Sequence, residues 1–145
     1  MRVDDELDLG ALPIGEYAFP GPLRDRIVAA ILDGDKTSTS SLAEEWRRDG
    51  AEFPRVGGLE VVIDSAGEAV CITRNITVTI TRLANVPSEH AVAEGEGFDD
   101  VAAWRRAHEK FWTSDDYRAA VGEPPIAIDD DTEVVCVSFE VMHRF

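Results

Sequence analysis

The chain has 145 residues, a length typical of one compact domain with a single core. Apolar residues make up 44% and charged residues 30%, as in ordinary globular proteins, and no segment approaches the roughly 18 consecutive apolar residues of a membrane span. The formal net charge is −15, from 29 acidic and 14 basic residues. Such a field repels nucleic acid, and it favours a ligand of nucleoside size over a long RNA or DNA.

Residues 1–18 are predicted to form an acidic arm that packs loosely or caps the domain, because Gly10, Pro13 and Gly15 interrupt any periodicity. The arm lacks the basic flank and apolar core of a secretory signal, so we expect a cytoplasmic protein. Residues 19–145 are predicted to form the domain proper.

Two helices carry clear sequence signals. The first begins at Gly21–Pro22, places Leu23, Ile27 and Ile31 on one face, and ends at Gly34. The second is "DDVAAWRRAHEKFW", an amphipathic segment that Asp99 or Asp100 would cap. Shorter helical turns are predicted around Trp46 and in "SEHAVAEGEG", where Ser88 is a possible N-cap.

The β-strand signals lie in the second half of the chain. "LEVVI" (59–63), a turn at 64–67 and "AVCITRNITVTITRL" (69–83) predict a hairpin whose second strand is long and bent. A closing strand is predicted at 133–145, with Val135, Val137, Phe139 and Val141 on its apolar face. Strands with inserted helices predict an α+β fold on a small, mostly antiparallel β-barrel, although the pattern alone fits an open sheet as well.

Lys36 stands directly after the first helix, within "DGDKTSTSS". On its own it reads as a solvated cation at the negative end of a helix, worth about 0.3–1 kcal/mol. The connection that follows (42–58) contains Gly50, Pro54 and a Gly-Gly pair, which indicates a surface segment bordering a cleft.

The segments "GDKTST", "FPRVGG", "AVAEGEGF", "AAWRRAHEKFW" and "CVSFEVMHRF" follow one another in an order and spacing that resemble the ASCH domain family, over residues 19–143. The resemblance implies a PUA-like fold, a small β-barrel closed at its ends by helices, with a cleft between barrel and helices. Activities attributed to members include hydrolysis of the acyl amide of N4-acetylcytidine and cleavage of RNA, and related folds bind RNA. The family therefore does not define one function.

The resemblance places the amidohydrolase residues of the family at Lys36, Thr39 and Glu94. Amide cleavage needs a nucleophile, a base that takes its proton and an acid for the departing amine. A lysine acts as the base only when desolvation or neighbouring cations lower its pKa, so we expect Lys36 to be at least partly buried. Glu94 would protonate the leaving nitrogen well if burial or a neighbour such as Glu96 raised its pKa.

Candidate ligand-binding residues are Thr37, Ser38, Trp46, Arg74, Trp104 and His108. These two tryptophans, Trp112 and the histidine could stack on a base, but core packing is the commoner role for an aromatic residue on a helix. Arg74, in an otherwise uncharged strand segment, could pair with Glu94 or hold a phosphate, or it could simply lie at the rim of the barrel.

No cofactor or metal site is expected, because His90, His108 and His143 lack ligand spacing. Cys71 and Cys136 lie in β-rich segments and outside any CxxC pair, which predicts buried, reduced thiols. The main hypothesis is a metal-independent amidohydrolase of N4-acylcytidine-like substrates. The alternatives are a module that binds or cuts short single-stranded RNA, and a non-catalytic domain that binds a small ligand; the oligomeric state is left open.

Overall fold

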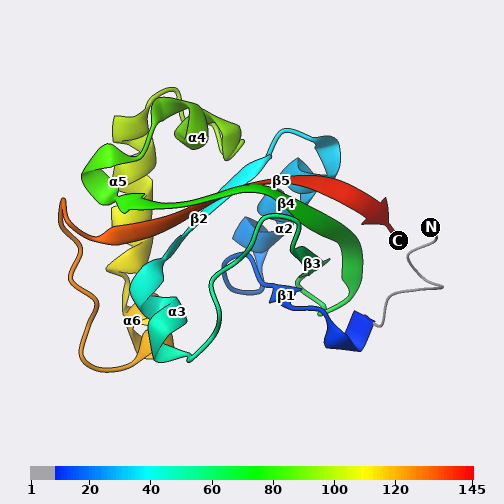
Figure 1. The fold of residues 1–145 in the computed structure, drawn as a ribbon, viewed down its shortest axis with the longest axis horizontal. Helices are drawn as coiled ribbons and strands as arrows, with labels where there is room; N and C mark the ends of the chain where they lie inside the picture. The colour runs from blue at the N-terminus through cyan, green and yellow to red at the C-terminus, as the bar shows by residue number, and fades with distance from the viewer. Residues whose placement is uncertain (1–8) are drawn as a thin grey trace.

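The computed structural model describes residues 9–145, an α+β domain built on one five-stranded sheet (Figure 1). The elements in chain order are η1 (Leu9–Ala11), β1 (Ile14–Gly15), α2 (Pro22–Asp33), β2 (Ser38–Leu42), α3 (Ala43–Arg48), β3 (Leu59–Ile63), β4 (Ala69–Arg82), η2 (Leu83–Asn85), α4 (Ser88–Ala93), α5 (Val101–Trp112), α6 (Asp115–Val121) and β5 (Glu133–Arg144). None of the helices in this part of the chain is both long and apolar enough to cross a membrane.

The sheet has the order β1-β3-β4-β5-β2 and is antiparallel except for the β1–β3 pair. Figure 1 shows β4 and β5 running side by side along the molecule, with α4 and α5 at one end of them. The predicted closed barrel is wrong: over residues 9–145, β1 pairs with β3 and β2 pairs with β5, and these two edge strands form no ladder with each other. Edge strands of two and five residues are too short to complete the staggered register that closure requires.

Helix α2 agrees with its sequence signals. Pro22 is its first residue, and Gly34 ends it in the left-handed conformation at φ 85°. Ile27 and Ile31 are buried, but Leu23 on the same predicted face is 39% exposed because it lines a cleft described below.

The cap of α5 is Asp100, whose Oδ1 accepts a hydrogen bond from the Ala103 N–H at 2.8 Å. The possible N-cap Ser88 is instead the first residue of α4, after Pro87, and makes no capping hydrogen bond. The sequence signals missed α6, which follows Ser114, and also β2.

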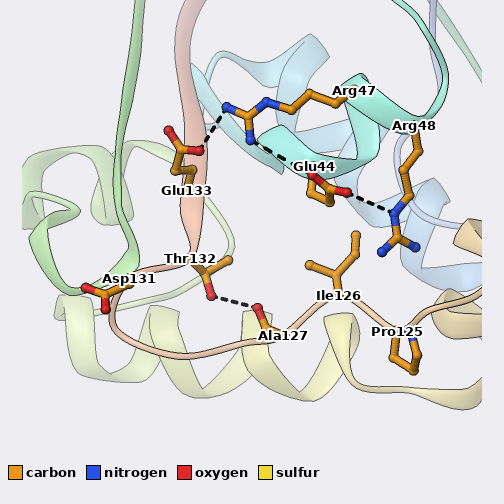
Figure 2. Close-up of a pocket in the computed structure, with 9 residues that line it drawn as sticks. All are labelled: Glu44, Arg47, Arg48, Pro125, Ile126, Ala127, Asp131, Thr132 and Glu133. Atoms are coloured by element: carbon orange, nitrogen blue, oxygen red, sulfur yellow. Dashed lines mark hydrogen bonds and ion pairs between the residues drawn. The ribbon is translucent and has the colours of Figure 1, made fainter.

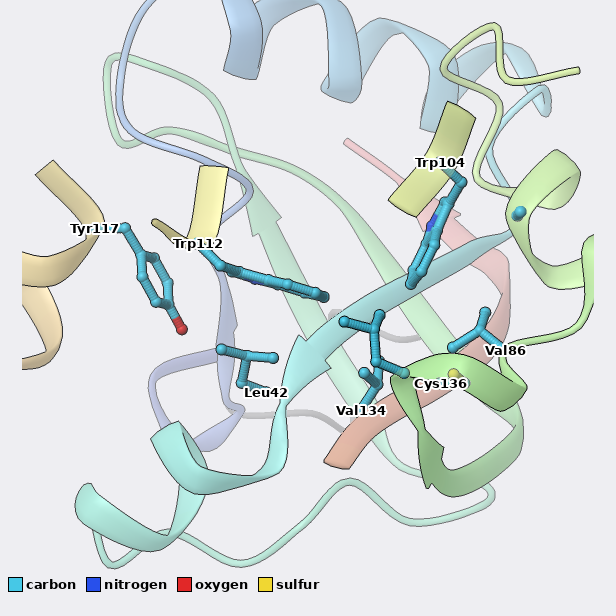
Figure 3. Packing of buried hydrophobic residues seen from close by; sticks show 9 residues of the cluster. Leu42, Val86, Trp104, Trp112, Tyr117, Val134 and Cys136 are labelled. Atoms are coloured by element: carbon cyan, nitrogen blue, oxygen red, sulfur yellow. The ribbon is translucent and has the colours of Figure 1, made fainter. Parts of the chain in front are cut away.

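The core lies on both sides of the sheet. Val134 and Cys136 pack into a cluster with Trp104, Trp112 and Leu42, shown in Figure 3. The intervening residues of β5, Val135 and Val137, pack with Ala43, Trp46 and Phe53. Four consecutive residues of β5 are therefore buried. The sequence pattern predicted an apolar face on one side of this strand, whereas residues on both sides are buried. Both cysteines are free and buried, as predicted.

Part of the predicted N-terminal arm lies outside the described residues, but residues 9–18 are joined to the domain. β1 pairs with β3, and the buried Arg24 side chain donates to the carbonyl oxygens of Tyr17 (3.1 Å), Ala18 (2.9 Å) and Asp64 (3.3 Å). These bonds tie the arm to α2 and to the β3–β4 turn. As a result, Tyr17 is held beside the site described next.

Candidate functional site

A cleft of about 320 Å³ opens between α2, the start of β2, the segment after α4, and α5. Its polar lining includes Lys36, Thr39, Ser40, Glu94 and Glu96. Its aromatic lining is Tyr17, Phe98, His108, Phe111 and Trp112. The cleft therefore brings together all three residues that the resemblance placed in an active site.

Lys36 is 2% exposed, so it is not the solvated cation that its position after a helix suggests. Its Nζ donates to Glu94 Oε1 at 3.3 Å, to the Glu94 carbonyl oxygen at 3.3 Å and to Glu96 Oε2 at 3.2 Å. It also lies 5.9 Å from the centroid of the Tyr17 ring. The partial burial expected of this lysine is present, and its partners are two carboxylates.

The α4–α5 connection is held directly against the turn that carries Lys36. The Thr37 N–H donates to the Ala93 carbonyl at 2.8 Å. Gly95 has φ +68°, and a Cβ at this position would lie 2.3 Å from the Asp35 carbonyl oxygen and 2.7 Å from the Lys36 Cα. Only glycine permits both this conformation and this approach, which explains the first glycine of the "EGEG" motif.

Glu94 is 1% exposed, and donors surround its carboxylate. Oε2 accepts from Ser40 Oγ at 2.6 Å and from the Trp104 indole N–H, and His90 Nε2 lies 3.5 Å away. On the other oxygen, Oε1, the contacts are Lys36 Nζ and His108 Nε2, each at 3.3 Å. The two carboxylate oxygens are therefore fully engaged.

This environment determines the charge of Glu94. Burial by itself would raise the pKa of the carboxyl group, but the hydrogen bonds from His108 and His90 and the charge of Lys36 outweigh it and hold the pKa well below its ordinary value. Glu94 is consequently ionised at neutral pH, and the raised pKa that would make it a proton donor is not found.

Thr39 lines the cleft and is half-buried, and its hydroxyl makes no hydrogen bond to any residue within 9–145. Side chains alternate along a strand, and the two neighbours of Thr39 face α4: Ser38 Oγ donates to the His90 carbonyl at 2.9 Å, and Ser40 binds Glu94. Ser38 is 1% exposed, and its hydroxyl is occupied by this bond. The adjacent Thr37 is exposed, and its hydroxyl lies 3.5 Å from the Ala93 carbonyl oxygen.

His108 lies in the cleft wall between other rings. Its Nδ1 is 2.9 Å from the Trp104 carbonyl oxygen, and its ring stacks on the Trp104 indole with a centroid distance of 4.4 Å. Trp104 is fully buried, so it presents no face to a ligand; it packs in the core and donates to Glu94. Of the predicted stacking residues on α5, His108 and Trp112 line the cleft.

Two predicted ligand contacts lie outside the cleft. Arg74 is exposed and donates from Nε (3.1 Å) and Nη2 (2.8 Å) to Glu140 Oε1 across the β4–β5 ladder, so it does not pair with Glu94. Trp46 donates from Nε1 to Ser41 Oγ at 2.8 Å and packs against Phe53. From the sequence alone, neither residue could be excluded as a ligand contact, because the register of β4 and the position of α3 were not known.

Several residues of the site were not among the candidates of the sequence interpretation, including Tyr17, Ser40, His90 and Glu96. Glu96 was considered only as a neighbour that could raise the pKa of Glu94. Ser40 and His90 could have been found only by recognising β2 and pairing its inner face with α4. Tyr17 was assigned to the arm.

A second hollow of about 320 Å³ lies beside the 42–58 connection, at the opposite end of β2 (Figure 2). Four of its charged side chains form two ion pairs: Arg47 Nη2 binds Glu133 Oε1 at 2.8 Å, and Arg48 Nε binds Glu44 Oε2 at 3.2 Å. The connection thus borders a cleft, as predicted, but the charged side chains of these two pairs are not buried. The cleft around Lys36 is the better candidate site.

Within residues 9–145 no group of three or more histidine, cysteine, aspartate or glutamate side chains is arranged to hold a metal ion. The described part of the cleft offers ion pairs and hydroxyl groups.

The sequence profile described as "ASCH domain" matches residues 16–143. The chain is similar to the crystal structure of an ASCH domain from Lactobacillus crispatus, with 28% identity, a TM-score of 0.70, and coverage of 83% of this chain and 72% of that one. It also shares its fold with a protein from Enterococcus faecalis V583, with 23% identity, a TM-score of 0.80, and coverage of 98% and 83%. No curated protein sequence matches the chain significantly.

Proposed function

The chain belongs to the ASCH domain family, and we propose that its cleft binds a nucleoside-like ligand and hydrolyses the exocyclic amide of N4-acylcytidine-type substrates. The buried ion pair between Lys36 and Glu94, at the wall of a cleft that Thr39 also lines, carries this proposal. A volume of about 320 Å³ is at the lower end for small-molecule sites, which suits a nucleoside. The family is consistent with an RNA-related function.

In the proposed reaction, the Thr39 hydroxyl oxygen attacks the acyl carbonyl carbon and its proton passes to Lys36 Nζ. Lys36 must first give up a proton of its own, and Glu96 Oε2, at 3.2 Å on a side chain 22% exposed, is the acceptor nearest to solvent. The C–N bond then breaks, and the exocyclic nitrogen leaves with a proton. Water hydrolyses the threonyl ester and releases the acid.

A cleft that binds without chemistry is the second candidate. The aromatic wall formed by Tyr17, Phe98 and Phe111 favours it, because aromatic side chains stack on nucleobases with about 1–3 kcal/mol per base. In that case a nucleoside or a short single-stranded RNA would raise the melting temperature without being converted. The net charge of −15 weighs against long RNA.

The test is release of cytidine from N4-acetylcytidine and other N4-acylcytidines, followed by chromatography. We compare the natural protein with Thr39→Ala and Lys36→Met, and with Thr79→Ala as the control, because Thr79 is an exposed threonine of β4 outside the cleft. The first two variants should lose at least about 100-fold in rate, the usual contribution of a positioned acid–base group, and the control should keep its rate. Absence of release by the natural protein, or full activity of Thr39→Ala, would overturn the proposal.

A further inference from the structure

Both ring nitrogens of His108 face groups that only accept hydrogen bonds. Nδ1 lies 2.9 Å from the Trp104 carbonyl oxygen, and Nε2 lies 3.3 Å from Glu94 Oε1, a carboxylate oxygen. A neutral imidazole carries a single N–H and satisfies one such partner, whereas an imidazolium satisfies two. Both contacts are therefore satisfied only when His108 is protonated.

The ring is also fixed in direction while remaining accessible. It stacks on Trp104 at 4.4 Å, with the Trp112 and Phe98 rings at 5.1 and 5.9 Å. Its side chain is 15% exposed, and it lines the same cleft as Thr39. The Nε2 proton points at Glu94 Oε1, 3.3 Å away, and Glu94 lines the same cleft, so a ligand nitrogen that approaches beside this oxygen can take the proton.

The charged groups around His108 come from several elements. Glu94 and Glu96 lie in the α4–α5 connection and favour its cationic form. Lys36, before β2, binds the same two carboxylates, His90 on α4 approaches the far oxygen of Glu94, and Arg26 on α2 lines the cleft. Burial lowers the pKa of His108, but the hydrogen bond and charge of Glu94 outweigh it, so that the pKa lies above its ordinary value.

We propose that His108 is the catalytic acid that protonates the departing exocyclic nitrogen; this inference rests on the proposed amidohydrolase function. As the C–N bond breaks, its electron pair goes to nitrogen, which takes the proton from His108 Nε2. The neutral ring keeps its other proton on Nδ1, held by the Trp104 carbonyl. Water then attacks the threonyl ester and gives a proton to Nε2, and Lys36 returns a proton to Thr39. Glu94 remains a carboxylate throughout and stabilises the imidazolium.

The kinetic test compares two substrates that differ in what they require of an acid. The amine leaving from an N4-acylcytidine needs a proton, whereas 4-nitrophenolate, leaving from 4-nitrophenyl acetate, does not. The acylation step is followed in single-turnover or burst experiments, because the later water step uses His108 with either substrate. In this step His108→Gln should lose about 100-fold or more on the amide, a typical contribution of general acid catalysis, and only a few-fold in the burst of 4-nitrophenolate from the ester. His143→Gln, at the far end of β5, is the matched control and should be unchanged on both.

Equal loss on both substrates would mean a structural role, and no loss on the amide would mean no role; either result overturns the proposal. A second readout does not depend on turnover: imidazole ¹⁵N NMR should show N–H on both nitrogens of His108 at pH 7, and Glu94→Gln should lower its pKa. An unprotonated Nε2 at pH 7 would overturn the proposal even if the amide is hydrolysed. Absence of turnover by the natural protein overturns the proposed function, and the role of His108 as the catalytic acid is then overturned as well.

Discussion

Replacing Glu94 by glutamine should destabilise the fold strongly. The substitution Glu94→Gln keeps the shape of the side chain, but it removes the negative charge that Lys36 and His108 share. Lys36 is 2% exposed and cannot reach bulk water without movement of the surrounding chain. In the variant, the buried Lys36 ammonium and the His108 imidazolium therefore have less negative charge near them than in the natural protein.

Removing one partner of a buried ion pair typically costs about 3–5 kcal/mol. Here Glu96 remains 3.2 Å from Lys36 Nζ, and His108 can release its proton, so we expect a loss of unfolding free energy near the lower limit, about 3 kcal/mol. In a domain of this size such a loss lowers the melting temperature by about 6–12 °C.

The assay is equilibrium unfolding in urea, followed by tryptophan fluorescence and circular dichroism. Glu133→Gln is the control, because Glu133 pairs with Arg47 at the surface, where both side chains are about half exposed. Such surface pairs are worth about 0–1 kcal/mol, so the midpoint of the control should move little.

A double-mutant cycle separates the charge effect from other consequences of the substitution. Lys36→Met removes the stranded ammonium, so the double variant Lys36→Met/Glu94→Gln should be less destabilised than the sum of the single variants, by about 1–3 kcal/mol. A loss below about 1 kcal/mol for Glu94→Gln, or strict additivity with Lys36→Met, would refute the reasoning that the pair is energetically coupled.

Two further predictions concern the same site. Gly95→Ala should lose at least about 2 kcal/mol more than Gly97→Ala in urea unfolding, because both have positive φ but only the Gly95 Cβ would meet the Asp35 carbonyl; equal losses would contradict this. The pKa of His108 is raised on folding. Protonation of His108 therefore adds to the free energy of unfolding, fully below about pH 6.5, and this contribution is lost as pH rises through the folded-state pKa. The difference in unfolding free energy between the natural protein and His108→Gln should therefore shrink above that pH, and a difference that grows would contradict the sign.

The helices α2 and α5 and the β3–β4 hairpin were predictable because their signals are local. Pro22 and Gly34 bound α2, Asp100 caps α5, and β-branched residues alternate along β4. Each signal acts through hydrogen bonds or side-chain periodicity within a few residues. Helix α6 was missed although it carries a local signal, the N-cap Ser114, whose side chain accepts a hydrogen bond from the Tyr117 N–H.

Strand β2 could not be predicted in the same way. Its sequence, "STSSL", is mostly small and polar, and it becomes a strand by pairing with residues 134–138 of β5, which lie far along the chain. The open sheet likewise follows from which strands meet at the edges, a question of long-range register that hydrophobic patterns do not answer.

For the candidate site, the resemblance to the ASCH family placed Lys36, Thr39 and Glu94 together, whereas the residues by themselves favoured a solvated Lys36 at the end of a helix. The charge of Glu94 and its partners were decided by the tertiary structure, which brings Ser40, His90 and His108 around a carboxylate buried beside Lys36. A pKa depends on burial and on charges within a few ångströms in space, and the groups that hold Glu94 ionised come from β2, α4 and α5. These groups lower the pKa of Glu94, which was expected to act as a proton donor, and His108 is the neighbouring group that the geometry favours as the acid.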